Sequence, residues 1–131
     1  YTAARSRLLQ SIATHKPSNP LVLGGDVHTC WVTDLKADFA DPAAPAIATE
    51  FVTTSITSQA PRQEALAAML PDNPHIRYVN SLYRGYLRLD LGRDDARADL
   101  RAVDTVRDRN ASIRTLQSFA VESGQAGARL A

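Results

Sequence analysis

Pro20-Leu21-Val22-Leu23-Gly24-Gly25-Asp26-Val27-His28 is the stretch that decides the fold of this 131-residue chain. Its apolar run, bounded by a proline and two glycines, is typical of a short strand that is covered on both faces of a sheet. Asp26 and His28 follow this strand two residues apart, so in an extended segment their side chains point to the same side. A carboxylate oxygen beside an imidazole nitrogen at a strand end is a pattern that calcium and transition-metal sites use.

The same two residues have a plainer explanation. An Asp after a strand often caps a turn, and a nearby His is often an ordinary surface or core residue. The pair does not complete a metal site either, because a metal ion needs about four ligands. The other histidines, His15 and His75, lie in unrelated parts of the sequence.

Composition places the chain among globular proteins. Hydrophobic residues make up 44% and charged residues 22%, so one domain over 1–131 can bury a core. The formal net charge of +1, without a basic patch, argues against a nucleic-acid partner or binding to a membrane surface. No apolar run is long enough to span a membrane, and no export signal is visible. Because residue 1 is Tyr rather than Met, we interpret the chain as a processed or truncated product.

Hydrophobic periodicity divides the chain into two parts. The first part predicts a helix over 2–15 with Thr2 as its N-cap, then buried strands and a short helix. In the second part apolar and charged residues alternate on both sides of the turn Gly92–Asp95, which predicts an antiparallel hairpin with one face in water. The further expected elements are strands at 21–25, 30–35, 46–54, 76–80, 86–91, 96–106 and 115–122 and a helix at 61–70.

The order of these elements is unusual for a complete α/β domain. A strand that is buried on both faces needs parallel neighbours and helices on each side. One such strand followed by an antiparallel meander indicates that some of its neighbours belong to sequence outside these 131 residues. Taken alone, the chain reads as α+β.

Several motifs along the chain resemble the C-terminal part of the alkaline phosphatase D (PhoD-like) family. The strongest is the Gly-Asp-Val-His sequence within Asn19–His28, followed by Trp31. The remaining pieces follow the family order: Tyr1 with Ala4-Arg5 and Leu8-Leu9, Ala48–Val52, Thr54–Ser58, Asn73–Ile76, Asn80 with Arg84–Tyr86, and Val103–Val106.

The resemblance implies an α/β fold, namely the C-terminal half of a four-layer αββα metallophosphoesterase sandwich. Residues 1–131 would be one domain, the C-terminal portion of a catalytic domain whose N-terminal metal-binding half is absent. The family hydrolyses phosphomonoesters and phosphodiesters with iron and calcium, and its members are exported, which implies a periplasmic or extracellular parent. Carried over, Asp26 would lie on the calcium side and His28 would bind iron.

Other residues fit the family pattern less directly. Cys30 comes after the Gly-Asp-Val-His motif, so it is not the iron-binding Cys of the family and is expected to be a buried side chain. Asn80 and Arg84 are candidates for substrate binding, because guanidinium groups match phosphate oxygens in a bidentate way. The alternative, which the sequence favours, is a turn residue at Asn80 and a surface charge on a strand at Arg84. No residue is assigned a catalytic role.

The resemblance therefore implies part of a metal-dependent phosphoesterase that acts on a phosphoester substrate, and we expect it to be inactive without its missing N-terminal half. The strand edge left open at 21–25 predicts a dimer or higher oligomer for the isolated chain. Two readings compete with this one. The chain could be a standalone, non-enzymatic α+β domain that binds a partner through its sheet, or its metal pair could be vestigial.

Overall fold

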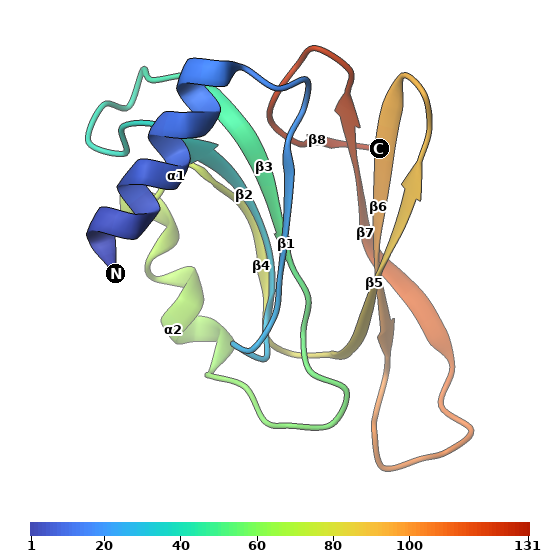
Figure 1. Ribbon diagram of the computed structural model, residues 1–131. Coiled ribbons are helices and arrows are strands. Elements are labelled where there is room, and N and C mark those ends of the chain that lie inside the picture. The colour runs from blue at the N-terminus through green and yellow to red at the C-terminus, as the bar shows by residue number, and fades with distance from the viewer.

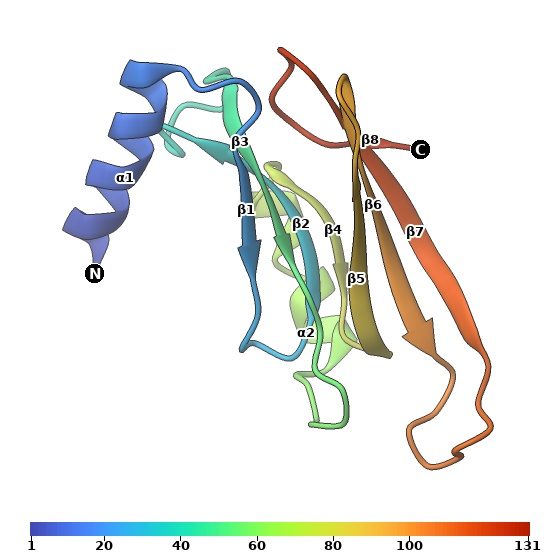
Figure 2. The same ribbon diagram turned by 45° about the vertical axis from the view of Figure 1, so that its right-hand side comes forward.

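The computed structural model describes all residues from Tyr1 to Ala131. Two four-stranded sheets face each other, and the helices lie on the outer face of the first sheet (Figures 1 and 2). The elements in chain order are α1 (Thr2–His15), β1 (Leu21–Gly24), β2 (Cys30–Lys36), β3 (Ala46–Val52), α2 (Gln63–Ala67), a 3-10 helix (Leu70–Asp72), β4 (Ile76–Asn80), β5 (Arg84–Leu91), β6 (Asp95–Val103), β7 (Ile113–Glu122) and β8 (Arg129–Leu130).

The first sheet is mixed and has the strand order β1-β3-β2-β4. β1 runs parallel to β3, whereas β2 is antiparallel to both β3 and β4. α1 packs over β3, and α2 packs over β4. None of the helices has the length and apolar character that crossing a bilayer requires.

The second sheet is an antiparallel meander with the order β5-β6-β7-β8. Leu87 pairs with Leu100 and Leu89 with Ala98, so the apolar residues of the predicted hairpin share the inner face. The predicted hairpin around Gly92–Asp95 is confirmed. No helix covers the outer face of this sheet (Figure 2).

The hydrophobic core lies between the two sheets. Its buried members come from β2 and β3 on one side and from β6 and β7 on the other: Cys30, Val32, Phe51, Ala98, Leu100, Phe119 and Val121. Tyr78 of β4 packs edge-on against Phe119, with their ring centroids 5.8 Å apart. The α/β fold class is therefore confirmed, and this chain supplies one helical layer and both sheets.

Three sequence predictions about local structure are wrong. β1 is not covered on both faces, because its Leu23 is 60% exposed, although its open edge, with β3 as its one partner, agrees with the sequence prediction. Thr2 is the first helical residue and not the cap, since Tyr1 occupies the cap position without a side-chain hydrogen bond. The helix expected at 61–70 is divided into α2 and a 3-10 helix that contains Pro71.

The C-terminal end is more ordered than its glycines suggest. The main-chain N–H of Gly127 donates to the Thr49 hydroxyl at 3.0 Å, and that of Ala128 donates to the Asp34 carboxylate at 3.3 Å. The Arg77 guanidinium pairs with the same buried carboxylate. These contacts attach the end of the second sheet to the first sheet, so the two sheets are held together at their edges as well as through the core.

Candidate metal centre

The loop Gly25–Thr29 lies at the carboxyl end of β1, at the lower end of the molecule in Figure 1. In α/β sheets, ligands bind outside the carboxyl ends of the parallel strands. Asp26 and His28, the predicted metal ligands, are therefore at the end of the sheet where such a site is expected. They also lie beside the open edge of β1.

The loop is tightly turned and not extended. Asp26 and His28 have φ angles of 74° and 58°, and the main-chain N–H of Val27 donates to the Gly25 carbonyl at 3.0 Å. The prediction that the two side chains project from an extended segment is wrong, because each comes from a left-handed residue. Left-handed backbone at a non-glycine residue costs about 1–2 kcal/mol, so the surrounding contacts must hold the turn.

The imidazole of His28 is oriented by one main-chain contact. Its Nδ1 lies 2.8 Å from the carbonyl oxygen of Gln59, in the loop that follows β3. Because a carbonyl only accepts, Nδ1 carries the proton, and the lone pair of the neutral ring is on Nε2. No residue of the chain hydrogen-bonds Nε2. A carbonyl on one ring nitrogen and a free lone pair on the other is the arrangement that metal-binding histidines use.

The carboxylate of Asp26 is equally unengaged. The residue is exposed, and neither carboxylate oxygen accepts a hydrogen bond or forms an ion pair within the chain. Asp caps in turns ordinarily accept from a main-chain N–H, as Asp38 does from Ala40 at 2.8 Å. Asp26 has no such contact, so its oxygens remain available to a cation.

A hydrogen-bonded cluster holds the main chain of His28. The His28 carbonyl oxygen lies 3.0 Å from the buried Thr54 hydroxyl and 3.3 Å from Nη1 of Arg84. Arg84 also donates to the Thr54 hydroxyl at 3.1 Å, the Tyr83 carbonyl at 2.8 Å and the Ser81 carbonyl at 3.0 Å. Arg84 therefore fastens the start of β5 to the loop that carries His28, and it is more than a charge on a strand surface.

Asn80 is a turn residue in this structure. Its side-chain oxygen accepts from the main-chain N–H groups of Leu82 at 3.0 Å and Tyr83 at 3.3 Å. The resulting turn joins β4 to β5 and carries Arg84 to the His28 loop. Arg84 contacts the loop of the candidate ligands directly, whereas Asn80 acts on it through this turn.

The 131 residues supply two candidate ligands and no complete site. No group of three or more His, Cys, Asp or Glu side chains is arranged to hold a metal. Cys30 lies in the core, and its burial raises the pKa of the thiol. His15 contacts the Ser11 carbonyl within α1, and His75 packs edge-on against Phe39, with ring centroids 4.8 Å apart.

The contacts of Thr54 and Gln59 were not predicted from the sequence. Thr54 belongs to a run of hydroxyl residues that carries no positional information of its own. Gln59 acts through its carbonyl oxygen, which every residue has, so no side-chain pattern identifies it.

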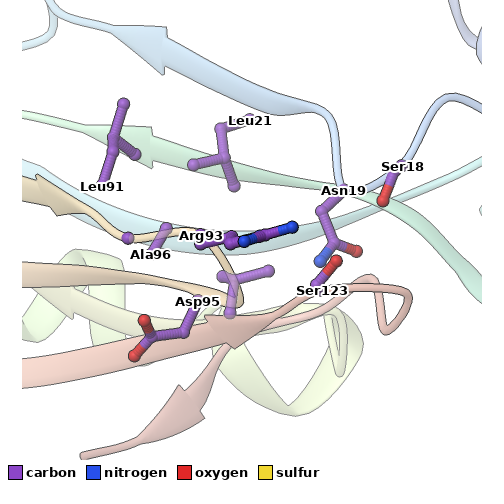
Figure 3. A pocket seen from close by; sticks show the side chains of 10 residues that line it. Ser18, Asn19, Leu21, Leu91, Arg93, Asp95, Ala96 and Ser123 are labelled. Atoms are coloured by element: carbon purple, nitrogen blue, oxygen red, sulfur yellow. The ribbon is translucent and has the colours of Figure 1, made fainter.

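Two cavities lie at the opposite end of the sheets from this loop. A cleft of about 280 Å³ runs between the start of β1 and the β5–β6 turn, where the side chains of Arg93 and Asn19 approach each other (Figure 3). A larger cavity of about 670 Å³ lies beneath the C-terminal end of α1. Neither is lined by Asp26 or His28.

Comparison with known proteins agrees with this geometry. A family model described as PhoD-like phosphatase matches residues 1–100. Alkaline phosphatase D of Bacillus subtilis (strain 168) is 36% identical over 132 aligned residues, which cover 98% of this chain and 22% of that protein. A solved structure described as "Structure of PhoD" matches with a TM-score of 0.90 and 36% identity over 99% of this chain and 25% of the other. The chain spans a quarter or less of these relatives and belongs to the PhoD-like phosphatase family.

Proposed function

We propose that this chain is the C-terminal portion of a metal-dependent phosphoesterase domain, in which Asp26 and His28 each bind a metal ion. One observation carries the proposal. The Nδ1 of His28 is fixed on the Gln59 carbonyl at 2.8 Å, which leaves Nε2 free, and the same loop carries the unpaired carboxylate of Asp26. Family membership supplies the reaction class, hydrolysis of phosphate monoesters or diesters.

The donor chemistry of the pair fits the proposed metals. Carboxylate oxygen is a preferred ligand of calcium, and imidazole nitrogen suits iron, so we assign Asp26 to calcium and His28 to iron. The pair does not complete either coordination shell, and we assign the remaining ligands to the N-terminal part of the longer relatives. Bound cations would neutralise charge on the phosphate and acidify a water molecule.

This chain's own residues have a positioning role in the proposal. Gln59 sets the ring orientation and tautomer of His28, while Thr54 and Arg84 hold the carbonyl at the base of the loop. Preorganisation of this kind keeps ligands within the narrow range of geometry that tight metal binding requires. We also keep Asn80 and Arg84 as proposed substrate contacts, since a guanidinium group can donate to phosphate oxygens alongside its present partners.

The isolated 131 residues should be inactive and prone to association. Two ligands hold a metal weakly, and the open edge of β1 presents unpaired main-chain groups beside the exposed Leu23. We propose that the missing N-terminal half covers this edge in the complete protein, and that a second copy covers it when the chain is alone. We place the complete protein in the periplasm or outside the cell.

A non-enzymatic module that binds a partner through the β1 edge is the second candidate, and the incomplete ligand set favours it. The intact mass of the protein in fresh cell extract separates the two. A species several times heavier than 14.2 kDa supports the phosphoesterase, whereas a species of 14.2 kDa supports the module.

Activity of variants in the complete protein tests the proposal itself. Asp26→Asn and His28→Ala should each abolish phosphate release from 4-nitrophenyl phosphate and lower the metal content, and a chelator should do the same to the wild type. His15→Ala is the matched control, because His15 is an exposed histidine on α1. A wild-type rate for His28→Ala would refute the assignment.

A further inference from the structure

A polar cleft opens beside the His28 loop. It has a volume of about 460 Å³, within the range of roughly 300–1,000 Å³ that is usual for small-molecule sites. Three segments line it: the loop after β3, the turn that enters β5, and the loop between β6 and β7. These segments meet at the lower end of the molecule, where β1 also ends (Figures 1 and 2).

Gln59 joins this cleft to the candidate metal centre. Its carbonyl oxygen is the acceptor for His28 Nδ1 at 2.8 Å, and the residue itself lines the cleft. Arg84 also does both, because it holds the His28 carbonyl and lies in the cleft wall. A substrate with its scissile phosphate near Asp26 and His28 would therefore have this cleft as its immediate neighbour.

The cleft has an excess of positive charge. Arg84 donates only to carbonyl and hydroxyl oxygens, which are uncharged, and Arg107 has no carboxylate partner at all. The one acidic residue in the lining, Asp104, is already paired with Arg114 at 2.9 Å. The lining therefore carries two guanidinium groups without a carboxylate partner, whereas its one carboxylate is already paired. This excess of positive charge attracts an anion to the cleft.

The lining also offers unused hydrogen-bond donors. The hydroxyl of Thr57 and the side-chain amide of Gln59 make no hydrogen bonds within the chain, although both residues line the cleft. The loop that carries Arg107 is shaped by its own contact, since the Arg107 main-chain N–H donates to the Thr105 hydroxyl at 3.2 Å. The guanidinium of Arg107 makes no hydrogen bond within the chain. Its two parallel N–H groups can therefore donate to two oxygens of one phosphate.

We infer that this cleft binds a second phosphate group of the substrate, beside the scissile ester, and that Arg107 determines this specificity. The inference rests on the proposed function, because the cleft acquires this role from its position beside His28. The preferred substrates are then phosphate esters whose alcohol carries a further phosphate group.

A matched pair of substrates tests the inference in the complete protein. Propane-1,3-diol monophosphate and its bisphosphate differ only in the second phosphate, and the initial rate of phosphate release gives kcat/KM for each. The wild type should prefer the bisphosphate by about tenfold, the size of effect that one charge-assisted contact gives. Arg107→Ala should abolish this preference, and Arg107→Lys should restore part of it.

Arg109→Ala is the control variant. Arg109 is an exposed arginine of the same loop that does not line the cleft, so its loss should leave the preference at the wild-type ratio. Loss of the preference in Arg109→Ala to the same extent as in Arg107→Ala would show general electrostatic attraction and would overturn the inference. A wild type without a preference would overturn it as well.

A binding experiment separates failure of this inference from failure of the proposed function. Calorimetric titration of inorganic pyrophosphate into the chelator-treated protein should give an affinity that Arg107→Ala weakens at least about fivefold and Arg109→Ala does not. If neither the diol phosphates nor 4-nitrophenyl phosphate is hydrolysed, the proposed function fails, but this titration still decides whether the cleft binds phosphate. Equal affinity of wild type and Arg107→Ala overturns the inference.

Discussion

Arg84→Ala should loosen the loop of the proposed metal ligands and also destabilise the fold. The guanidinium makes contacts of 2.8–3.3 Å with the carbonyls of His28, Tyr83 and Ser81 and with the Thr54 hydroxyl. Nη1 has two hydrogens for three of these acceptors, so we count three effective hydrogen bonds in all. At about 1 kcal/mol each for a partly buried position, the variant should lose roughly 2–3 kcal/mol of unfolding free energy.

Two measurements check this prediction in the complete protein. Urea titration should show a lower midpoint for Arg84→Ala, and metal titration should show an affinity reduced by about 10–100-fold, as for other outer-shell losses. Arg84→Lys keeps the positive charge but loses the forked guanidinium. Its urea midpoint and metal affinity should lie between those of the wild type and Arg84→Ala. Arg109→Ala should stay within about 0.5 kcal/mol of wild type. An Arg84→Ala variant of normal stability and metal affinity would refute the conclusion that Arg84 holds the His28 loop in place.

Three further predictions concern the sheets. Gly85→Ala would place its Cβ 1.9 Å from the Arg101 carbonyl oxygen, so β5 and β6 must separate; we expect a loss of about 3 kcal/mol or more, or no folded protein by circular dichroism. The Ser118 hydroxyl, together with two arginines, holds the pKa of Asp99 below its usual range. Its contribution to stability is therefore full above about pH 4 and is lost as pH falls through the folded pKa. Between pH 2 and 7, the urea midpoint of Asp99→Asn should fall less steeply with falling pH than that of the wild type. An identical fall in both proteins would argue against this. Burial raises the pKa of Glu50, which forms no ion pair, so its ionised form destabilises the fold once pH exceeds that pKa. Glu50→Gln should be more stable than wild type at pH 7 but not at pH 3, and a variant destabilised at pH 7 would contradict this.

Much of the architecture could be predicted from local patterns. Alternation across Gly92–Asp95 predicted the hairpin, because a two-residue period fixes which side chains face the core. Apolar runs predicted β2 and β3 to within about two residues. The burial of β1 was overestimated because an apolar run predicts a covered strand, whereas β1 lies at the edge of its sheet and pairs with β3 alone.

For the candidate site, the sequence predicted which residues are involved but not how they are arranged. The Gly-Asp-Val-His motif indicated Asp26 and His28, and the resemblance to the family gave them a role. Their left-handed backbone, the Gln59 carbonyl and the Thr54–Arg84 clamp depend on contacts between segments far apart in the sequence. Such contacts follow from the tertiary fold, and local sequence patterns do not encode them.

Metal content is the most direct test of the claim that Asp26 and His28 are part of a metal centre completed outside this chain. Bound iron and calcium should be measured by mass spectrometry in the purified complete protein, in its Asp26→Ala/His28→Ala double variant, and in residues 1–131 alone. We expect stoichiometric metal in the complete protein and little in the other two samples. Full metal content in the double variant, or tight stoichiometric binding by the 131 residues alone, would contradict the account.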